Sequence, residues 1–594
     1  MNKLLKSILP VLLVLSVGAC AKPTARPVAE PKAQPEAATA SAQPHQRQSV
    51  RAEKSMISVA NPHAARAGRA ILRAGGSAID AAIAAQMVLN LVEPQSSGIG
   101  GGGFLMHFNA KNGDLAAYDG RETAPASATP DMFLNTDGQP LAFFDAVVGG
   151  LSVGVPGALR MLEAAHKEHG LLPWAKLFED AIRLAEGGFT VSERLHKLVA
   201  GDRYLKRHRT TAAYFYDDTG APWPVGHILK NPELAATLRQ IATGGADAFY
   251  QGPIAQAMVD TVSHGIGNPG GLSLADLSAY KTIKREPACL FYRKWLVCGF
   301  GPPSSGGLTT LQILGMLQSF DLGSMKPGKD GLPDVRAVHL ISEAARLAFA
   351  DRNAFIADED FVAVPSAGML DPGYLERRAA EISTSRSIGR AAPGTPGGKT
   401  SQFAPGTSSL GLSTTHMSIV DANGNAVSMT TSIENAFGSR MMVGGFLLNN
   451  QLTDFNFRPT VDGRPVANAA APGKRPRSSM SPTLVFDNQG RVVLAIGSPG
   501  GSRIIGYVVK TLIATLDWEM DIQQAIDMPN FTNRNTPTDL EQGTAIETLA
   551  DKLKALGQEI RTRPMTSGLH GIHIVDGVLF GGADQRREGV ALGD

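Results

Sequence analysis

This sequence holds few cysteines, few aromatic residues (6%) and almost no net charge. Three cysteines in 594 residues are too few for a disulfide-stapled scaffold or a cysteine-rich zinc site. With 56 basic and 54 acidic residues, the chain lacks the positive excess that nucleic-acid binding requires. The 13 histidines show no metal-ligand spacing, so we expect no metal site. Hydrophobic residues at 43% and charged residues at 19% indicate a globular protein and exclude wholesale disorder.

The N-terminal hydrophobic run is short. Ile8–Val17 is almost wholly apolar but too short to span a bilayer. The run follows Lys3 and Lys6 and ends in Val17-Gly18-Ala19-Cys20, which resembles a bacterial lipoprotein signal. We therefore expect residues 1–19 to be a signal peptide and Cys20 to be the lipidated first residue of the mature chain. A secretory signal with an incidental cysteine is the alternative.

Residues 20–50 join this anchor to a segment that is rich in proline and alanine and lacks apolar periodicity. Such a composition favours an extended tether that holds the following domain away from the membrane. Ala21 follows Cys20 where an aspartate would favour the inner membrane, so the outer membrane is the expected one. The prediction is an exported lipoprotein on the periplasmic side of a bacterial membrane, attached only through its lipid.

The body of the chain mixes helical and strand patterns. Apolar spacing predicts helices over 77–93, 156–169, 173–187, 335–357 and 506–516. Short strands are expected over 104–108, 417–420, 426–431, 482–486 and 492–496. Asn423-Gly424 indicates a hairpin turn between the second and third of these strands. Residues 384–413 are rich in glycine, proline, serine and threonine, which is typical of an exposed linker.

Two short motifs compete for a functional interpretation. Gly98-Ile99-Gly100-Gly101-Gly102-Gly103 satisfies G-x-G-x-x-G, but a helix precedes it and a strand follows, the reverse of a dinucleotide-binding fold. A packed glycine turn explains it better. Gly150-Leu151-Ser152-Val153-Gly154 satisfies G-x-S-x-G, and an expected strand at Ala146–Val148 and a helix opening at Pro156 flank it. A serine hydrolase using Ser152 is therefore an alternative, although nothing nominates its acid or histidine partner.

A third motif, Ser413-Thr414-Thr415-His416, lies directly after the linker and before a predicted strand. This motif is informative only together with other motifs, which occur in a fixed order along the chain. These are Asp119-Gly120-Arg121-Glu122-Thr123-Ala124-Pro125, Pro302-Pro303-Ser304-Ser305-Gly306-Gly307, Asn449-Asn450-Gln451 before Asp454, Lys474-Arg475-Pro476 before Ser478-Ser479-Met480-Ser481, Gly497-Ser498-Pro499-Gly500-Gly501-Ser502-Arg503, and Arg586-Arg587-Glu588-Gly589. The ordered set resembles the γ-glutamyltranspeptidases, also called glutathione hydrolases, from about Ser55 to Asp594.

The resemblance implies an α+β fold and a precursor that cuts itself. Members of that family adopt the N-terminal-nucleophile hydrolase fold, a four-layer αββα sandwich with two antiparallel sheets between helical layers. On this sequence the matching cleavage site is the bond between Ser413 and Thr414. Residues 51–413 would then form a large subunit and residues 414–594 a small subunit, and the two would stay together as a heterodimer that builds the sandwich jointly.

The resemblance also implies a chemistry that depends on a free N-terminal threonine. A threonine hydroxyl is a poor nucleophile, and its own α-amine, with a reference pKa of ~7.7–8.0, can act as the base only after the cut. Thr414 would carry the γ-glutamyl group of glutathione and other γ-glutamyl amides as an ester. It would transfer this group to water or to an amino-acid or peptide amine, without a cofactor.

The resemblance assigns the remaining roles residue by residue. The catalytic set is Thr414, a hydroxyl from Ser432, and an oxyanion loop at Gly500 and Gly501. The substrate-binding set is Arg121, Ser478 and Ser479 for the α-carboxylate of the donor, with Glu434, Gln451 and Asp454 for its α-ammonium. A cephalosporin-type acylase of the same fold stays open as an alternative.

Cys289 and Cys298 lie at matching positions of an expected hairpin. With a two-residue turn at Arg293-Lys294, Tyr292 pairs with Trp295, and Cys289 then pairs with Cys298. At a non-hydrogen-bonded pair the Cα atoms come within ~4.5–5.5 Å, which suits a disulfide. In an oxidising periplasm the hypothesis is a cross-strand bridge.

Overall fold

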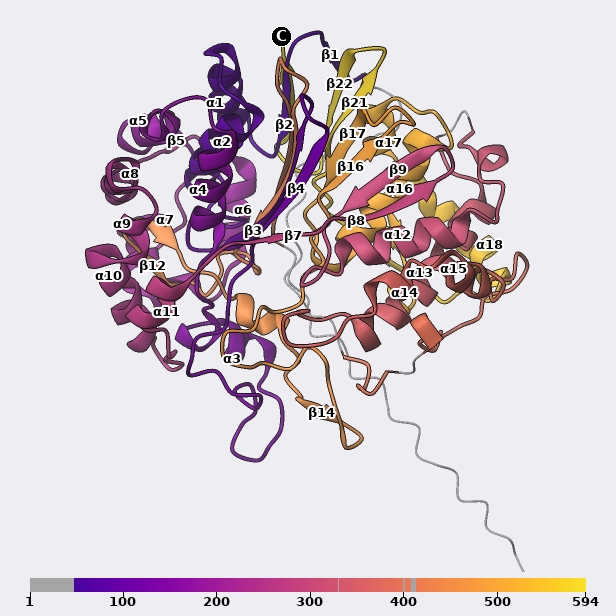
Figure 1. Cartoon of the computed structure of the whole chain (residues 1–594). Coiled ribbons are helices and arrows are strands. Elements are labelled where there is room, and N and C mark those ends of the chain that lie inside the picture. Colours follow the sequence, from indigo (N-terminus) through magenta and orange to yellow (C-terminus); the bar gives the residue numbers. More distant parts are fainter. Residues whose placement is uncertain (1–46, 329–330, 399–400, 407–412) are drawn as a thin grey trace, which may run out of the picture. The chain divides into compact units, whose positions relative to one another are not determined.

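Two seven-stranded antiparallel sheets stack between layers of helices in the computed structural model (Figure 1). The structure describes residues 47–328, 331–398, 401–406 and 413–594, and all of these belong to one compact unit. The expected signal peptide, Cys20 and nearly all of the tether lie outside the described residues. Among the helices that are described, none is both long enough and apolar enough to cross a membrane.

The first sheet contains the segment that follows Thr414. Its strand order is β23–β2–β10–β11–β3–β4–β7. The bounds are β2 Met56–Val59, β3 Gly102–Asn109, β4 Asp114–Gly120, β7 Ile283–Arg285, β10 Thr415–Val420, β11 Ala426–Ser432 and β23 Val590–Gly593. β10 pairs with β2 on one side and β11 on the other, so the chain directly after Thr414 lies inside the sheet.

The second sheet has the order β1–β22–β21–β17–β16–β9–β8. The bounds are β1 Val50–Ala52, β8 Ala288–Tyr292, β9 Trp295–Gly299, β16 Thr483–Phe486, β17 Val492–Gly497, β21 His570–Val575 and β22 Val578–Ala583. β8 and β9 form the expected hairpin, in which Tyr292 pairs with Trp295 and Cys289 with Cys298. The two cysteines are disulfide-bonded, with Cα atoms 4.1 Å apart.

Strand β3 of the first sheet is buried on both faces because both faces are covered. On β3, Leu105 packs with the helices outside the sheet, whereas Phe104 and Phe108 face the other sheet. The Phe108 ring meets Phe486 of β16 with centroids 5.1 Å apart, and Phe104 meets Phe300 at 4.4 Å. Alternate side chains thus point to opposite faces, and neither face reaches water. This is the αββα layering that the sequence motifs predict.

The hairpin between β10 and β11 follows the Asn423-Gly424 signal. Val420 pairs with Ala426, and Gly424 takes a positive φ of 81° in the connecting loop. The Asp421 carboxylate accepts from the backbone N–H groups of Asn423 (2.9 Å) and Asn425 (3.1 Å), which closes the turn.

Helices cover the outer face of the first sheet, on the left in Figure 1. The larger ones are α1 Pro62–Arg73, α2 Ala78–Val92, α4 Ala158–His169, α5 Glu179–Gly187, α8 Pro232–Gly244 and α10 Gly252–Ser263. All of α2 is buried, which explains why its sequence is apolar on every side. Ser77 and Asp80 form a reciprocal capping box that fixes where α2 begins.

Other helices cover the second sheet, on the right in Figure 1. They are α12 Gly306–Leu317, α13 Val335–Phe355, α14 Ser366–Met369, α15 Pro372–Ala379, α16 Ile504–Leu516, α17 Ile522–Asp527 and α18 Ala550–Ala555. The helices expected over 77–93, 156–169, 335–357 and 506–516 are confirmed within two residues at each end. The helix expected over 173–187 is interrupted, because residues 174–178 form a 3₁₀ turn before α5.

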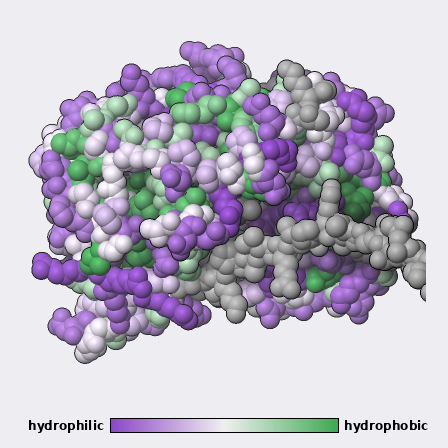
Figure 2. Space-filling model, turned by 90° about the horizontal axis from the view of Figure 1, so that it is seen from below, coloured by the Kyte–Doolittle hydropathy of each residue, from purple (hydrophilic) through white to green (hydrophobic). Residues whose placement is uncertain are grey.

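Short elements complete the described part of the chain. They are α3 Phe143–Val147, α6 Glu193–Gly201, α7 Arg209–Phe215, α9 Asp247–Tyr250, α11 Leu274–Ala279, β5 Phe189–Thr190, β6 Ile228–Leu229, β12 Met442–Val443, β13 Phe446–Leu447, β14 Thr460–Val461, β15 Arg464–Pro465, β18 Phe531–Thr532, β19 Thr538–Glu541 and β20 Ile560–Arg563. Figure 2 shows hydrophilic side chains over much of one face, with hydrophobic ones interspersed among them.

The described parts of the expected linker are attached to the body. Gly394 donates its N–H to Asp351 Oδ1 (2.7 Å), and Ala404 donates to the Pro465 carbonyl oxygen (2.8 Å). Ala404 is buried. The prediction of an exposed segment therefore fails at Ala404, because the backbone around it pairs with the chain beside β15. Residues 399–400 and 407–412 lie outside the described residues.

Candidate active site

Thr414 lies at the start of β10 with its hydroxyl against the preceding carbonyl group. The Thr414 hydroxyl donates to the Ser413 carbonyl oxygen (2.6 Å) and lies 3.1 Å from Ser432 Oγ at the end of β11. The Ser432 hydroxyl donates to the same carbonyl oxygen (2.9 Å). Sheet register creates this meeting, because Thr415 pairs with Thr431 and thereby places Thr414 beside Ser432.

The peptide bond between Ser413 and Thr414 is held from several sides. The Ser413 hydroxyl donates to the Gln95 carbonyl oxygen (2.6 Å), and the Ser413 N–H donates to the Glu434 carbonyl oxygen (3.1 Å). Arg587 Nη1 donates to the carbonyl oxygen of Thr414 (2.8 Å). The Gln95 loop, the chain after β11 and the turn before β23 thus fix the one bond that the sequence motif marks for cleavage.

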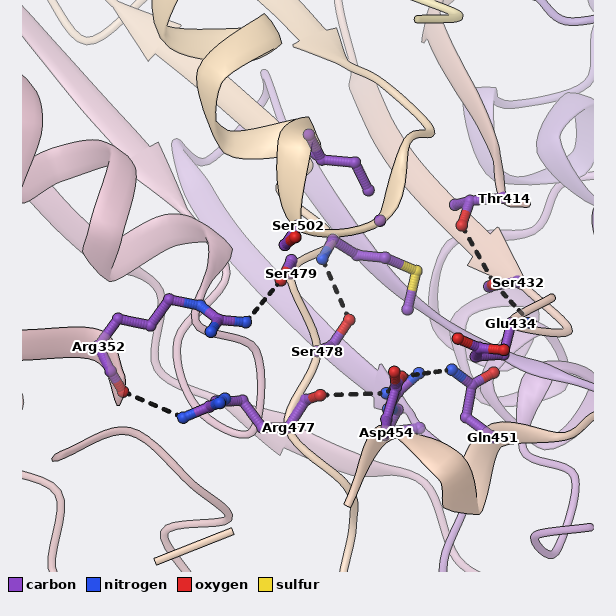
Figure 3. A pocket seen from close by; sticks show the side chains of 14 residues that line it. Arg352, Thr414, Ser432, Glu434, Gln451, Asp454, Arg477, Ser478, Ser479 and Ser502 are labelled. Carbon is purple, nitrogen blue, oxygen red and sulfur yellow. Dashed lines mark hydrogen bonds and ion pairs between the residues drawn. The ribbon is translucent and has the colours of Figure 1, made fainter. Parts of the chain in front are cut away.

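A cavity opens beside Thr414 (Figure 3). It brings together nine of the predicted residues, namely Arg121, Thr414, Ser432, Glu434, Gln451, Asp454, Ser478, Ser479 and Gly501. Five lining residues were not predicted, and these are Arg352, Arg477, Met480, Ser502 and Ile504. Two of the five, Met480 and Ser502, sit inside motifs that the sequence displays, and Arg477 and Ile504 directly adjoin such motifs. Arg352 lies on α13, whose apolar spacing indicates only burial.

Gly500 does not line the cavity, although its neighbour Gly501 does. Gly500 and Gly501 have φ values of +132° and +57°, which explains the glycine pair in the turn that leads into α16. A Cβ on Gly500 would lie 2.6 Å from the Tyr507 ring. This geometry leaves Gly501 as the member of the predicted oxyanion loop that faces the cavity.

Arg121 and Asp454 form an ion pair on the floor of the cavity. Arg121 follows β4 and is fully buried, and its Nε donates to the Pro476 carbonyl oxygen (3.0 Å). Gln451 Nε2 donates to Asp454 Oδ2 (2.8 Å), as the dashed line in Figure 3 shows. The cation and the anion expected to meet the two ends of a zwitterionic substrate are therefore neighbours, and each compensates the burial of the other.

Glu434 lies beside this pair with an unusual backbone and an unusual carboxyl group. Its φ is +78°, a region that non-glycine residues seldom occupy. Asn450 donates its side-chain N–H to the carboxyl group. Burial, followed by the charge of Asp454, raises the pKa of Glu434 to about 8. At neutral pH the carboxyl group is therefore mainly protonated.

The two predicted serines sit on a loop that a second loop supports. The Ser305 N–H and hydroxyl both donate to the Ser478 carbonyl oxygen (2.9 and 2.6 Å), and the Ser304 hydroxyl donates to the Met480 carbonyl oxygen (2.6 Å). Gly306 permits the approach, since a Cβ there would lie 2.2 Å from the Met480 oxygen. The Pro302–Gly307 motif thus positions the serine loop without lining the cavity.

The competing motifs have structural explanations. The Ser152 side chain is fully buried and donates to the carbonyl oxygens of Val147 (2.6 Å) and Gly149 (3.3 Å). Residues 143–147 form helix α3, so the strand expected at 146–148 is wrong and no strand–turn–helix elbow presents Ser152. The glycine run at Gly98–Gly103 connects α2 to β3, whose first two residues it supplies, and it is buried, as expected for a packed turn.

Comparisons with known proteins agree with this geometry. A model of the family described as "Gamma-glutamyltranspeptidase" matches residues 64–594. The chain belongs to the γ-glutamyltranspeptidase family. It is 37% identical over 553 residues to a glutathione hydrolase proenzyme of Bacillus subtilis (strain 168), with 91% of each chain covered. It is 36% identical over 552 residues to the glutathione hydrolase proenzyme of Escherichia coli (strain K12), covering 90% of this chain and 91% of that protein.

A solved structure supports the fold of this γ-glutamyltranspeptidase family member. The cephalosporin acylase from Bacillus halodurans matches with a TM-score of 0.78 at 27% identity, covering 94% of this chain and 98% of that one. The likeness extends over both sheets and their helical layers. The α+β sandwich predicted from the motifs is therefore confirmed, and an acylase shares it. No group of histidine, cysteine, aspartate and glutamate side chains within the described ranges could hold a metal ion.

Proposed function

We propose that this chain is the precursor of a γ-glutamyltransferase and glutathione hydrolase whose nucleophile is Thr414. The observation that carries the proposal is the convergence of the Thr414 and Ser432 hydroxyls on the Ser413 carbonyl oxygen, at 2.6 and 2.9 Å, beside the Arg121–Asp454 cavity. The identity to two glutathione hydrolase proenzymes supports it. The exact cleavage bond and the role of each residue belong to the proposal.

The first reaction would convert the precursor into the enzyme. Thr414 Oγ attacks the Ser413 carbonyl carbon, its proton passes to the departing Thr414 nitrogen, and the peptide becomes an ester. Water then hydrolyses the ester, which leaves a carboxylate on Ser413 and a free α-amine on Thr414. The Ser432 hydroxyl, which donates to the Ser413 carbonyl oxygen (2.9 Å), would stabilise the negative charge that this oxygen gains.

The second reaction would use the freed amine as a base. The amine accepts the proton of Thr414 Oγ while Oγ attacks the γ-carbonyl carbon of the donor, and the same proton leaves with the amine of the leaving group. Arg121, Ser478 and Ser479 would bind the donor's α-carboxylate, and Asp454 and Gln451 its α-ammonium, while the Gly501 loop receives the oxyanion. Water or an acceptor amine then resolves the γ-glutamyl ester.

A denaturing gel and an anilide assay test the proposal together. The expressed chain should give two fragments, one ending at Ser413 and one starting at Thr414, as N-terminal sequencing of the smaller fragment will show. Thr414→Ala should leave one uncut chain that does not hydrolyse γ-glutamyl-p-nitroanilide. The proposal fails if that variant stays active, and it fails in favour of a serine hydrolase if only Ser152→Ala is inactive.

We also propose that the mature chain is held at a membrane by a lipid on Cys20, as the Val17–Cys20 motif predicts. Expression in a bacterium that carries a lipoprotein pathway, with radiolabelled palmitate in the medium, should label the protein. Cys20→Ser should abolish the label and move the activity from the membrane fraction to the soluble fraction. An unlabelled wild-type protein would contradict the anchor without affecting the catalytic proposal.

A further inference from the structure

Two serines that line the cavity are each held by a buried arginine. Arg352 Nη2 donates to Ser479 Oγ (2.7 Å), and Arg534 Nη1 donates to Ser502 Oγ (2.8 Å). Arg352 comes from α13, and Arg534 from the turn between β18 and β19, so distant segments converge on one wall. Figure 3 draws Ser479 and Ser502 on the same side of the cavity, opposite Thr414.

The two hydroxyl groups are arranged as donors toward the cavity. A serine oxygen that accepts from a guanidinium group still has its own hydrogen to donate. Within the described part of the chain, neither the Ser479 nor the Ser502 hydroxyl donates to another group. Both residues line the cavity, so an acceptor bound there can take both hydrogens. A carboxylate oxygen suits this position, whereas an ammonium group does not.

The charges near this wall also favour an anion. The charges that act on Arg352 are those of Asp454, Arg477 and Arg534, one negative and two positive. Burial, followed by the charge of Arg477, holds the pKa of Arg352 well below its ordinary value. Burial likewise lowers the pKa of Arg477 to about 10. Positive charge is therefore costly here, and a bound carboxylate would offset that cost.

We propose that Ser502 is a third hydroxyl group for the carboxylate of the acyl donor, and that Arg352 and Arg534 are positioning residues that direct the Ser479 and Ser502 hydroxyls toward it. The inference rests on the proposed function and defines its donor class. The site selects acyl groups that end in a carboxylate, including monoamides of dicarboxylic acids that lack the α-amine.

The residues proposed to bind the donor's α-ammonium group should hold it more weakly than the serine wall holds its carboxylate. Asp454 shares its charge with Arg121, and the Glu434 carboxyl group is mainly protonated at neutral pH because its pKa is raised to about 8. Loss of the donor's amine therefore removes an interaction with one shared carboxylate. Loss of its carboxylate removes the acceptor of three serine hydroxyls, two of which are held in place by buried arginines. Removing the carboxylate should therefore lower kcat/KM more than removing the amine does.

Three p-nitroanilides separate these contributions on the cut enzyme. The γ-glutamyl anilide carries both charged groups, the glutaryl anilide carries only the carboxylate, and the 4-aminobutyryl anilide carries only the amine. The wild-type enzyme should hydrolyse the glutaryl anilide at least tenfold better, by kcat/KM, than the 4-aminobutyryl anilide. Ser502→Ala should raise KM about tenfold for the two carboxylate-bearing donors, with kcat and the 4-aminobutyryl donor little changed.

Arg352 is tested by a conservative and a disruptive substitution. Arg352→Met should raise KM for the carboxylate-bearing donors by tenfold or more, and Arg352→Lys should restore part of this loss. Arg346→Lys is the matched control, because Arg346 lies on the same helix, is buried, and contacts Glu343 (2.9 Å) and Gln558 (2.7 Å) outside the cavity. This control variant should leave the ratio of kcat/KM between the donors unchanged. Melting temperatures will show whether each variant is folded.

The outcomes distinguish the inference from the function on which it rests. A cut wild-type enzyme that does not hydrolyse the γ-glutamyl anilide overturns the proposed function. The role of Ser502 is overturned if the wild-type enzyme is active but Ser502→Ala lowers kcat/KM for all three donors by the same factor, or for none of them. If Arg352→Met lowers kcat/KM equally for the three donors while the protein stays folded, Arg352 has only a structural role. Equal hydrolysis of the glutaryl and 4-aminobutyryl anilides overturns the selection for a carboxylate.

Discussion

Replacing Glu434 with glutamine should change how the stability of the precursor depends on pH. Glu434 is 3% exposed, and burial together with the nearby charge of Asp454 raises its pKa to about 8 from the ordinary 4.5. The folded chain therefore keeps a proton on this carboxyl group in a range where the unfolded chain has already released it. A glutamine of similar shape has no proton to keep and can still accept from Asn450.

The direction and size of the effect follow from the two pKa values. Between pH 4.5 and pH 8 the folded state binds more protons than the unfolded state, so the free energy of unfolding falls as the pH rises. One pKa unit corresponds to about 1.4 kcal/mol. From pH 5 to pH 8 the loss at Glu434 then amounts to about 3 kcal/mol. Glutamine removes this loss.

Urea denaturation of the uncut Thr414→Ala chain, with and without Glu434→Gln, measures the effect. The remaining ionisable groups are the same in both proteins, so the difference between their free energies of unfolding reports Glu434 together with its effect on Asp454. That difference should move by about 3 kcal/mol in favour of the glutamine protein between pH 5 and pH 8. A constant difference, or one that moves in favour of glutamate, would show that Glu434 is ionised in the folded chain and would refute the reasoning.

Three further substitutions test other parts of the site and fold. Ser432→Ala should slow self-cleavage by about 10²-fold in a gel time course, because it removes a hydrogen bond to the oxygen that becomes negative; cleavage at the wild-type rate would contradict this. Gly306→Ala should raise KM for γ-glutamyl anilides at least tenfold, because its Cβ would lie 2.2 Å from the Met480 oxygen and displace the serine loop, whereas an unchanged KM would show that the loop adapts. Replacing Cys289 and Cys298 together by serine should lower the free energy of unfolding by about 2–3 kcal/mol in urea, and an unchanged value would show that the bridge contributes nothing.

Local signals predicted the local structure well. Ser77 with Asp80 placed the start of α2, and Asn423-Gly424 placed the turn between β10 and β11. In both cases the side chain or the glycine that forms the structure lies within a few residues of it. Such signals do not depend on the rest of the fold, and this is why the sequence displays them.

The errors arise where distant segments decide the outcome. Ser152 satisfies a short motif, but the hydrophobic residues before it fold as helix α3, and the serine is buried. Arg352 gives the opposite case. Its place on α13 predicts a buried helix position, and only the fold brings Ser305 and Ser479 to its guanidinium group. The nine predicted residues that line the cavity were found because their motifs occur in a characteristic order, and no single one of them carries that information.

The topology explains how a chain cut at Ser413 could keep its site. In the first sheet, β2 from the N-terminal side of the cut pairs with both β23 and β10 from the C-terminal side, and β11 pairs in turn with β3. In the second sheet, β1 pairs with β22 and β9 with β16. Separation of the fragments would break backbone hydrogen bonds and bury no surface in return, in both sheets at once. Both fragments also line the cavity, since Arg121 and Arg352 precede the cut and Thr414 and Asp454 follow it. Cleavage should therefore free the threonine amine and leave the surrounding walls in place.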